Sequence, residues 1–253
     1  MRTRVIPVLQ LQGGRLVKTS RFRRPIYVGD PINAVKIFND KEVDELVVLD
    51  IGATSQGRGP DLAGLRRLAD EAFMPMAYGG GLTNIADMRA VLKAGFEKVV
   101  LSSAALANPA LISQAANEFG AQSVVVSIDV ALRGLCHRRQ VVHGRGGTQV
   151  TRLDPVEHAR AMVAAGAGEI ILTCIDRDGG MSGYDLALLR TVAASVAIPV
   201  VALGGAGCLQ DLSNAAAAGA AGVAAGSMFV FHGPHRAVLI TYPDRTSLEV
   251  LLP

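Results

Sequence analysis

Carboxylates follow several short apolar runs of this sequence. Asp129 comes directly after SVVVSI, Asp50 ends another apolar run, and Asp176 and Asp178 lie in DRDGGMSGYD. A carboxylate held at such a place can act as a general acid or base, because burial tunes its pKa. The alternative is a solvated turn or a helix cap, which is the better interpretation for Asp185. Asp129 is the strongest candidate, since a rigid apolar segment carries it.

An amide stands at the end of the first apolar run. The stretch VIPVLQLQGGRLVKT places Gln10 where its run ends, as Asp129 ends its own. An amide does not exchange a proton near neutral pH, so Gln10 cannot serve as a general base. Acid–base catalysis that uses a pair of carboxylates is therefore not expected beside Gln10.

Two glycine pairs have the composition of anion-binding loops. Gly80-Gly81 and Gly204-Gly205 each follow an apolar run, and one run later comes a serine, Ser103 or Ser227. Glycine lets the backbone approach an oxyanion, its N–H donates, and a following helix N-terminus adds positive potential. The pattern predicts two phosphate sites, suited to a long ligand with a phosphate at each end or a diphosphate in one. Alternatively, the glycines only permit tight turns.

Three other features carry weaker signals. His232 and His235 have no carboxylate or cysteine at ligand spacing, so we favour a surface contact over a metal site. Cys174 has no recognisable His or Asn partner, so we expect it to pack. The basic segment Arg21–Arg24 (RFRR) is either solvated surface or a clamp on an anionic ligand or partner. We expect neither a metal nor a cofactor.

Eight short segments have the character of buried parallel strands, because they are apolar almost throughout rather than alternating. They are Arg4–Gln10, Leu46–Ile51, Pro75–Tyr78, Lys98–Ser102, Ser123–Asp129, Glu169–Cys174, Pro199–Leu203 and Gly222–Gly226. Longer amphipathic stretches separate them. Three of these begin with a capping side chain before proline, at Asp30-Pro31, Asn108-Pro109 and Asp154-Pro155.

Eight strand–helix units in 253 residues match the size of a TIM barrel, with a doubly wound open sheet as the alternative. An internal repeat favours the barrel. A shift of 124 residues places Gly80-Gly81 on Gly204-Gly205 and Ser103 on Ser227. We therefore expect one α/β domain, a (β/α)₈ barrel of two repeated half-barrels, about residues 1–122 and 123–253. Its working face is formed by the loops after the strands.

The composition is typical of a soluble globular protein. The 25 basic and 22 acidic side chains give a net charge of +3, too small to indicate nucleic acid or a membrane as a partner. The three cysteines, Cys136, Cys174 and Cys208, are odd in number and scattered, which favours a reducing compartment. Without a recognisable signal peptide or membrane-spanning run, a cytoplasmic location is expected.

Six segments together resemble the cyclase subunit of imidazole glycerol phosphate synthase. They are DELVVLDI, PMAYGGGL, EKVVLSSAALANP, VVVSID, GAGEIILTCIDRDGGMSGYD and PVVALGGAG, and the resemblance covers essentially the whole chain. It implies a TIM barrel of two half-barrels with a glutaminase subunit docked on its lower face. It also implies that ammonia passes up the barrel to a bisphosphorylated aminoimidazole precursor at the top.

The resemblance implies roles for individual residues. Asp129 matches the family's second catalytic aspartate, and Lys18 matches a lysine of its mobile first loop. The residues that match the two phosphate sites are Gly81, Ser102 and Ser103 for one, and Asp178, Gly179, Gly205 and Ser227 for the other.

Four charged residues at strand beginnings match the family's ammonia gate. They are Arg4, Glu45, Lys98 and Glu169, and their signs alternate around the expected barrel floor. A cluster of salt bridges that only stabilises the floor is the alternative.

The chain departs from the family pattern where the chemistry is expected. Gln10 replaces the first catalytic aspartate, and the family's VKDGR has become LQGGR. Ser102 stands where asparagine is usual, and Leu203 where serine is usual in the second phosphate loop. One aspartate and an amide serve an acid–base cyclisation poorly, since losing one such group costs ~10²–10⁴ in rate.

The C-terminal stretch GSMFVFHGPHRAVLITYP, with YVGDPINAV and KTSRFRRP, is similar to a divergent branch of the family. That branch is linked to acetamidino sugars of bacterial surface polysaccharides. There the barrel and its glutaminase deliver ammonia to a separate sugar amidotransferase.

The leading hypothesis is therefore a synthase-like subunit of a glutamine amidotransferase heterodimer, which relays ammonia toward sugar amidination. One alternative is a working cyclase of histidine biosynthesis, with Gln10 tolerated, that forms imidazole glycerol phosphate and AICAR from the aminoimidazole precursor and ammonia. A second alternative is a scaffold that activates its glutaminase without transferring ammonia. Expected partners are the glutaminase, a sugar amidotransferase and a phosphorylated small molecule, with neither nucleic acid nor a membrane.

Overall fold

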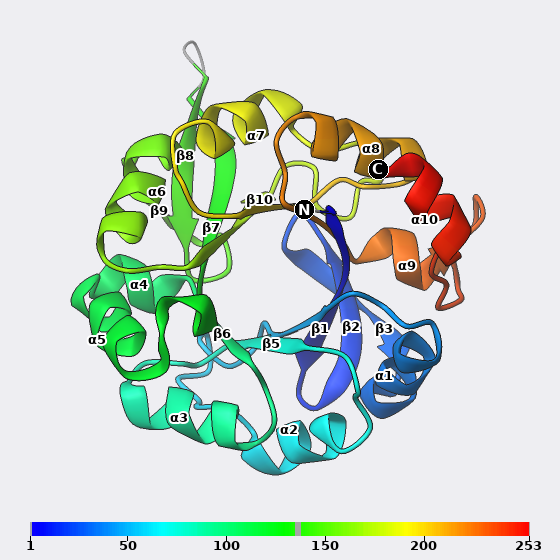
Figure 1. The fold of residues 1–253 in the computed structure, drawn as a ribbon, viewed down its shortest axis with the longest axis horizontal. Helices are drawn as coiled ribbons and strands as arrows, with labels where there is room; N and C mark the ends of the chain where they lie inside the picture. Colours follow the sequence, from blue (N-terminus) through cyan, green and yellow to red (C-terminus); the bar gives the residue numbers. More distant parts are fainter. Residues whose placement is uncertain (1, 135–137, 253) are drawn as a thin grey trace.

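A closed ring of parallel strands forms the centre of the molecule (Figure 1), in a computed structural model that describes residues 2–134 and 138–252. The eight barrel strands are β1 (Arg4–Gln12), β4 (Leu46–Asp50), β5 (Met76–Gly79), β6 (Lys98–Leu101), β7 (Val124–Arg133), β10 (Glu169–Cys174), β11 (Val200–Leu203) and β12 (Gly222–Ala225). Each of the eight pairs in parallel with two neighbours, and the ring is closed because β1 joins β12 to β4 and β10 joins β7 to β11. The predicted TIM barrel is confirmed, and the open sheet is excluded because such a sheet has two unpaired edges.

Helices surround the ring of strands (Figure 1). They are α1 (Pro31–Asp40), α2 (Leu62–Ala69), α3 (Ile85–Lys93), α4 (Ser103–Ala107), α5 (Ala110–Phe119), α6 (Pro155–Ala164), α7 (Leu186–Ala193), α8 (Leu209–Ala217), α9 (Ser227–Val230) and α10 (Arg245–Leu251), with a 3₁₀ turn, η1, at Ala121–Ser123. A large apolar core fills the space between strands and helices. Burial of this core supplies the main driving force for folding.

A separate apolar cluster fills the inside of the barrel. Its members are Ile6, Val8, Val47, Ala77, Val100, Val125, Ile171, Val201, Leu203 and Ala224. Side chains alternate between the two faces of a strand, so residues two apart point the same way. Gln10 therefore lies above Ile6 and Val8 inside the barrel, and Asp129 lies above Val125.

Two of the three predicted helix caps are confirmed. Asp30 accepts a hydrogen bond from the Asn33 N–H at 2.9 Å, and Asp154 accepts one from the Val156 N–H at 2.8 Å. A helix, α5, also begins directly after Pro109, but the cap predicted for Asn108 is wrong, because Asn108 ends α4 and its side chain caps no N–H of α5. The short helix α4, which the motif did not indicate, takes up the residues before Asn108.

Two barrel strands run beyond their predicted ends. β1 continues from Gln10 to Gln12, and β7 continues from Asp129 to Arg133. Each continues because an antiparallel partner turns back onto it: β2 (Arg15–Ser20) with β3 (Arg23–Gly29), and β8 (Arg139–Gly144) with β9 (Gln149–Val150). We call β2 and β3, with the turn between them, the lid hairpin. A third, short hairpin joins β13 (Phe231–His232) to β14 (Ala237–Val238).

Positions 124 residues apart adopt similar geometry. A Cβ atom at Gly80 would lie 2.5 Å from the Asp50 carbonyl oxygen, and one at Gly204 would lie 2.7 Å from that of Cys174. These close approaches require glycine at both places. The boundaries of the half-barrels, about residues 1–122 and 123–253, stay a prediction.

Candidate functional site

A cavity of about 560 Å³ opens at the mouth of the barrel, the end at which the strands finish. Its lining includes seven of the residues predicted from sequence: Gln10, Lys18, Gly81, Ser102, Ser103, Asp129 and Asp178. The size suits a small-molecule ligand. The cavity therefore brings the expected catalytic positions and one expected phosphate site together.

Asp129 is buried at the side of this cavity. Its Oδ1 accepts a hydrogen bond from Ser127 Oγ at 3.1 Å, and its Oδ2 accepts one from Ser102 Oγ at 3.3 Å. Burial raises the pKa of Asp129 to about 6, while these two hydrogen bonds act in the opposite direction. An acid with that pKa can both give and take a proton near neutral pH.

Gln10 occupies the matching place on the opposite half of the ring. In the parallel sheet Gln10 pairs with Leu49 on β4, and Asp129 pairs with Thr173 on β10. Leu49 and Thr173 are 124 positions apart, which is the period of the internal repeat. The Gln10 Oε1 accepts hydrogen bonds from the Thr19 N–H at 2.9 Å and from Thr19 Oγ1 at 3.1 Å. The amide thus holds the lid hairpin.

The lid hairpin also makes an ion pair across the mouth. Lys18 Nζ lies 2.9 Å from Asp178 Oδ1, and both side chains are buried. The Arg21 N–H donates to the Asp178 carbonyl oxygen at 2.9 Å. A Cβ atom at Gly179 would meet the Thr19 carbonyl oxygen at 2.6 Å. The lid hairpin is therefore closed over the loop after β10.

The first predicted phosphate site has its three residues on the cavity wall. Gly81 has a φ of 68°, and a Cβ atom there would lie 2.2 Å from the Arg58 carbonyl oxygen. Ser103 Oγ accepts a hydrogen bond from the Arg145 N–H at 2.9 Å. Ser102, by contrast, donates to Asp129. Ser102 therefore has a clear role beside the acid, whereas phosphate binding here stays a prediction.

The second predicted phosphate site is only partly exposed to the cavity. Of its four residues Asp178 lines the cavity, whereas Gly179, Gly205 and Ser227 do not. Ser227 is buried, and its Oγ lies 3.5 Å from Arg236 Nη2. The Arg236 guanidinium rests 4.7 Å from the centre of the Phe231 ring. A cation therefore lies at this predicted site.

The remaining acids near the mouth have structural partners. Asp50 forms an ion pair with Arg58 at 3.0 Å, and Asp176 accepts from the Leu132 N–H at 2.7 Å. Asp185 accepts from the N–H of Leu188 at 3.1 Å, which confirms its role as a helix cap. Asp129 is thus the acid of the cavity wall without a cationic partner among the residues described.

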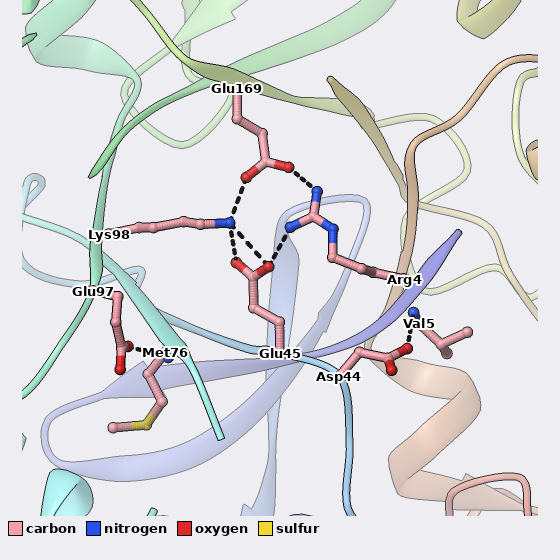
Figure 2. A network of polar contacts seen from close by, with 8 residues as sticks. All are labelled: Arg4, Val5, Asp44, Glu45, Met76, Glu97, Lys98 and Glu169. Atoms are coloured by element: carbon pink, nitrogen blue, oxygen red, sulfur yellow. Dashed lines mark hydrogen bonds and ion pairs between the residues drawn. The ribbon is translucent and has the colours of Figure 1, made fainter. Parts of the chain in front are cut away.

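The four charged residues predicted at the floor form one closed ring (Figure 2). Lys98 Nζ lies 2.9 Å from Glu45 Oε1 and 2.7 Å from Glu169 Oε2. Arg4 pairs with the same two carboxylates from the other side (Figure 2). Burial acts to lower the pKa of Arg4, but the hydrogen bonds and charges of Glu169 and Glu45 raise it overall. Each charge in the ring is matched, as a salt-bridge cluster requires.

Strand alternation connects the floor to the mouth. Along β1 the inward residues are Arg4, Ile6, Val8 and Gln10, and along β6 they are Lys98 and Val100, with Ser102 directly after the strand on the cavity wall. The barrel axis therefore passes from a charged ring through an apolar layer to a polar cavity.

The weaker sequence signals have these outcomes. Cys174 is buried, and burial raises its thiol pKa to about 11, which agrees with a packing role. Within residues 2–134 and 138–252, no group of three or more His, Cys, Asp or Glu side chains could hold a metal ion. Phe22 lines the cavity, while its arginine neighbours are exposed. Cys136 lies outside the described residues.

No helix in the described part of the chain is both long enough and apolar enough to span a membrane.

Sequence reasoning missed three polar residues around the site. Thr19 joins Gln10 to the lid hairpin, Ser127 holds Asp129, and Arg236 reaches Ser227. Ser127 could have been found, because it stands two residues before Asp129 on the same strand face. Thr19 and Arg236 gave no signal, since their contacts depend on how hairpins fold back.

Comparisons with known proteins agree with this geometry. The profile of the family described as "Histidine biosynthesis protein" matches residues 4–235. A Leptospira interrogans protein, provisionally named imidazole glycerol phosphate synthase subunit HisF, is 47% identical over 99% of both chains. A Pseudomonas aeruginosa protein, provisionally named as subunit hisF2 of the same synthase, is also 47% identical over 99% of both. A Hyphomonas neptunium protein, named imidazole glycerol phosphate synthase subunit HisF, is 43% identical over 91% of both.

Proposed function

The chain belongs to the histidine biosynthesis protein family, and from this premise we propose that it is the ammonia-receiving subunit of a glutamine amidotransferase. A glutaminase docks below the charged ring and releases ammonia there. The ammonia crosses the barrel to the cavity and is passed on for amidination of a sugar in surface polysaccharide synthesis. A sugar amidotransferase is the expected receiver.

The observation that carries this proposal is the order of layers along the barrel axis. The ring of Arg4, Glu45, Lys98 and Glu169 stands below an apolar layer, and the cavity stands above it. Neutral ammonia crosses apolar surroundings far more readily than an ammonium ion, because an unpaired charge is costly to desolvate. The apolar layer therefore lets neutral ammonia pass and excludes cations. The ring of four charged side chains has to open before ammonia can pass, as a gate does.

The mouth supports a changed chemistry there. Asp129 has a pKa of about 6, but the matching place on β1 holds an amide engaged with Thr19. A ring closure that needs two acid–base groups lacks one of them. Delivery of ammonia makes no such demand.

The first test addresses the gate. The chain, its glutaminase and the sugar amidotransferase are assayed together for amidinated sugar formed from glutamine and from ammonium chloride. Glu169→Gln should lower the glutamine-dependent rate at least tenfold while the ammonium-dependent rate stays within twofold. The matched control is Glu97→Gln: Glu97 accepts from the Met76 N–H at 2.6 Å and takes no part in the ring (Figure 2). An unchanged ratio in Glu169→Gln would favour a scaffold that only activates its glutaminase.

A working cyclase is the second candidate, and the poised Asp129 favours it. The relative from Hyphomonas neptunium carries the plain name of that synthase subunit. The test is turnover of the aminoimidazole precursor with ammonium chloride by the native protein and by Gln10→Asp. The relay predicts no native turnover and a gain in Gln10→Asp. Native turnover at the rate of an ordinary biosynthetic enzyme would overturn the relay.

A further inference from the structure

The orientation of the Gln10 amide is fixed by the lid hairpin. A backbone N–H can only donate, so the atom 2.9 Å from the Thr19 nitrogen has to be the amide oxygen. Thr19 Oγ1 lies 3.1 Å from the same oxygen. The Gln10 Nε2 group, with its two N–H donors, therefore points away from Thr19.

These two donors face the cavity. Gln10 is 7% exposed and belongs to the cavity wall. Throughout the described ranges, Gln10 Nε2 makes no hydrogen bond and is not among the fully enclosed side-chain atoms that lack a partner. Its donors are thus both open to the cavity and free to bind a ligand.

A carboxylate at this place would offer the cavity an acceptor, because both of its oxygens accept. Gln10 offers donors and carries no charge. Across the mouth, Asp129 supplies the acid–base group and is held by Ser127 and Ser102. The two matching positions of the ring thus present opposite hydrogen-bonding characters to one ligand.

We propose that Gln10 is a specificity-determining residue, which selects a ligand that carries a carbonyl or carboxylate oxygen on its β1 side. The inference rests on the proposed function and deepens it, since the ligand occupies the cavity from which ammonia is passed on. The Gln10 Nε2 donates to that oxygen, and the same geometry disfavours a ligand with a donor there, because two opposed donors leave both unpaired.

The experiment uses acetate as the acceptor probe and guanidinium chloride as the donor probe. Both are titrated at low millimolar to 100 mM concentration into the native protein labelled with ¹⁵N, with inorganic phosphate present to occupy other anion sites. The side-chain amide signal of Gln10 is assigned by its loss in Gln10→Glu. Acetate should move this signal, and its apparent affinity should fall at least tenfold in Gln10→Glu. Guanidinium should leave the native signal in place and bind at least tenfold more tightly to Gln10→Glu.

Gln12→Glu is the control for charge, because Gln12 lies on the same strand face and cavity wall without contacting Thr19. It should weaken acetate less than threefold. The inference is overturned if acetate leaves the Gln10 amide signal unmoved, or if both glutamate variants weaken acetate equally. Gln10→Met, which adds no charge, assigns the same amide signal independently, so misfolding of Gln10→Glu cannot hide the shift in the native protein. Failure here would leave the gate test untouched, and failure of the gate test would leave the acetate shift untouched.

Discussion

The floor and the mouth of this barrel treat charge in opposite ways. At the floor, Glu45 and Glu169 each contact both Arg4 and Lys98, so two acids and two bases cancel. At the mouth, Asp129 is buried without a cation, and burial raises its pKa to about 6. Matched charges suit the floor ring, whose four side chains have to stay closed or open together. An unmatched acid gives up stability at neutral pH and gains the ability to move a proton.

The lid hairpin lies between these extremes. Lys18 and Asp178 are a matched and buried pair, but Lys18 lies in β2 of a hairpin that projects from the barrel. The base of that hairpin is fixed, because Leu16 is 1% exposed and packs in the core. Four predictions test how far the contrast between floor and mouth holds.

The largest expected effect is loss of chemistry at the mouth. Asp129→Asn keeps the shape of the side chain and removes its titration, so the turnover of the aminoimidazole precursor that Gln10→Asp gains should fall ~10²–10⁴-fold when Asp129→Asn is added. The measurement is kcat with saturating ammonium in the Gln10→Asp protein, with Glu97→Gln added as the control. A loss below threefold would show that Asp129 is not the acid–base group of the mouth.

The second prediction concerns stability against pH. The folded pKa of Asp129, about 6, lies above its ordinary value of 3.8, so between these values the folded state holds a proton that the unfolded state has lost. Stability therefore falls as pH rises through this window, by about 3 kcal/mol for a shift of roughly two units. Urea unfolding at pH 4, 6 and 7.5 should show Asp129→Asn equal to the native protein at pH 4 and more stable above pH 6. A variant less stable than native at pH 7.5 would contradict the assignment.

The third prediction concerns the floor. Glu169→Gln leaves two cations facing one carboxylate, and the cost lies between that of a broken buried pair and that of an exposed one, about 2 kcal/mol. Urea unfolding at pH 7.5 measures it against Glu97→Gln, which retains an oxygen for the Met76 N–H. Equal losses of unfolding free energy in the two variants would mean that the ring of ion pairs does not stabilise the fold.

The smallest global effect is expected at the lid hairpin. Lys18→Met leaves Asp178 buried without its cation, yet the tip of the hairpin can lift and let water reach it. Global stability should fall by less than about 1 kcal/mol, whereas amide exchange at residues 18–24 should speed up about tenfold. Hydrogen exchange distinguishes this from global unfolding. A loss as large as that of Glu169→Gln would make the lid hairpin part of the rigid barrel.

Much of the fold could be predicted because its signals are local. Apolar runs gave all eight barrel strands, and the repeat at 124 residues favoured closure. Asp30 and Asp154 gave two helix starts, since a capping side chain acts on its own turn. The cap predicted at Asn108 failed, although a helix starts there, because Asn108 ends the short helix α4.

The site was predicted as a set of residues, but only in part as a set of contacts. Asp129, Gln10 and the four floor residues lie where the pattern of strand ends and beginnings placed them. Ser102, expected beside a phosphate, also donates to Asp129, a contact that the sequence did not indicate. Residue types and strand phase fix which side chains face the axis, whereas hydrogen-bond partners depend on distances between segments far apart in sequence.

The sequence by itself thus determined the barrel, the residues that line its axis and the absence of a carboxylate at position 10. Only the tertiary structure decided that the floor charges close into one ring and that the Gln10 oxygen is taken by Thr19. The reason is physical: side-chain direction follows from the two-residue period of a strand, which is written locally. The partner of a buried polar atom is chosen by how loops return to the barrel, and that choice sets which atoms remain free for a ligand.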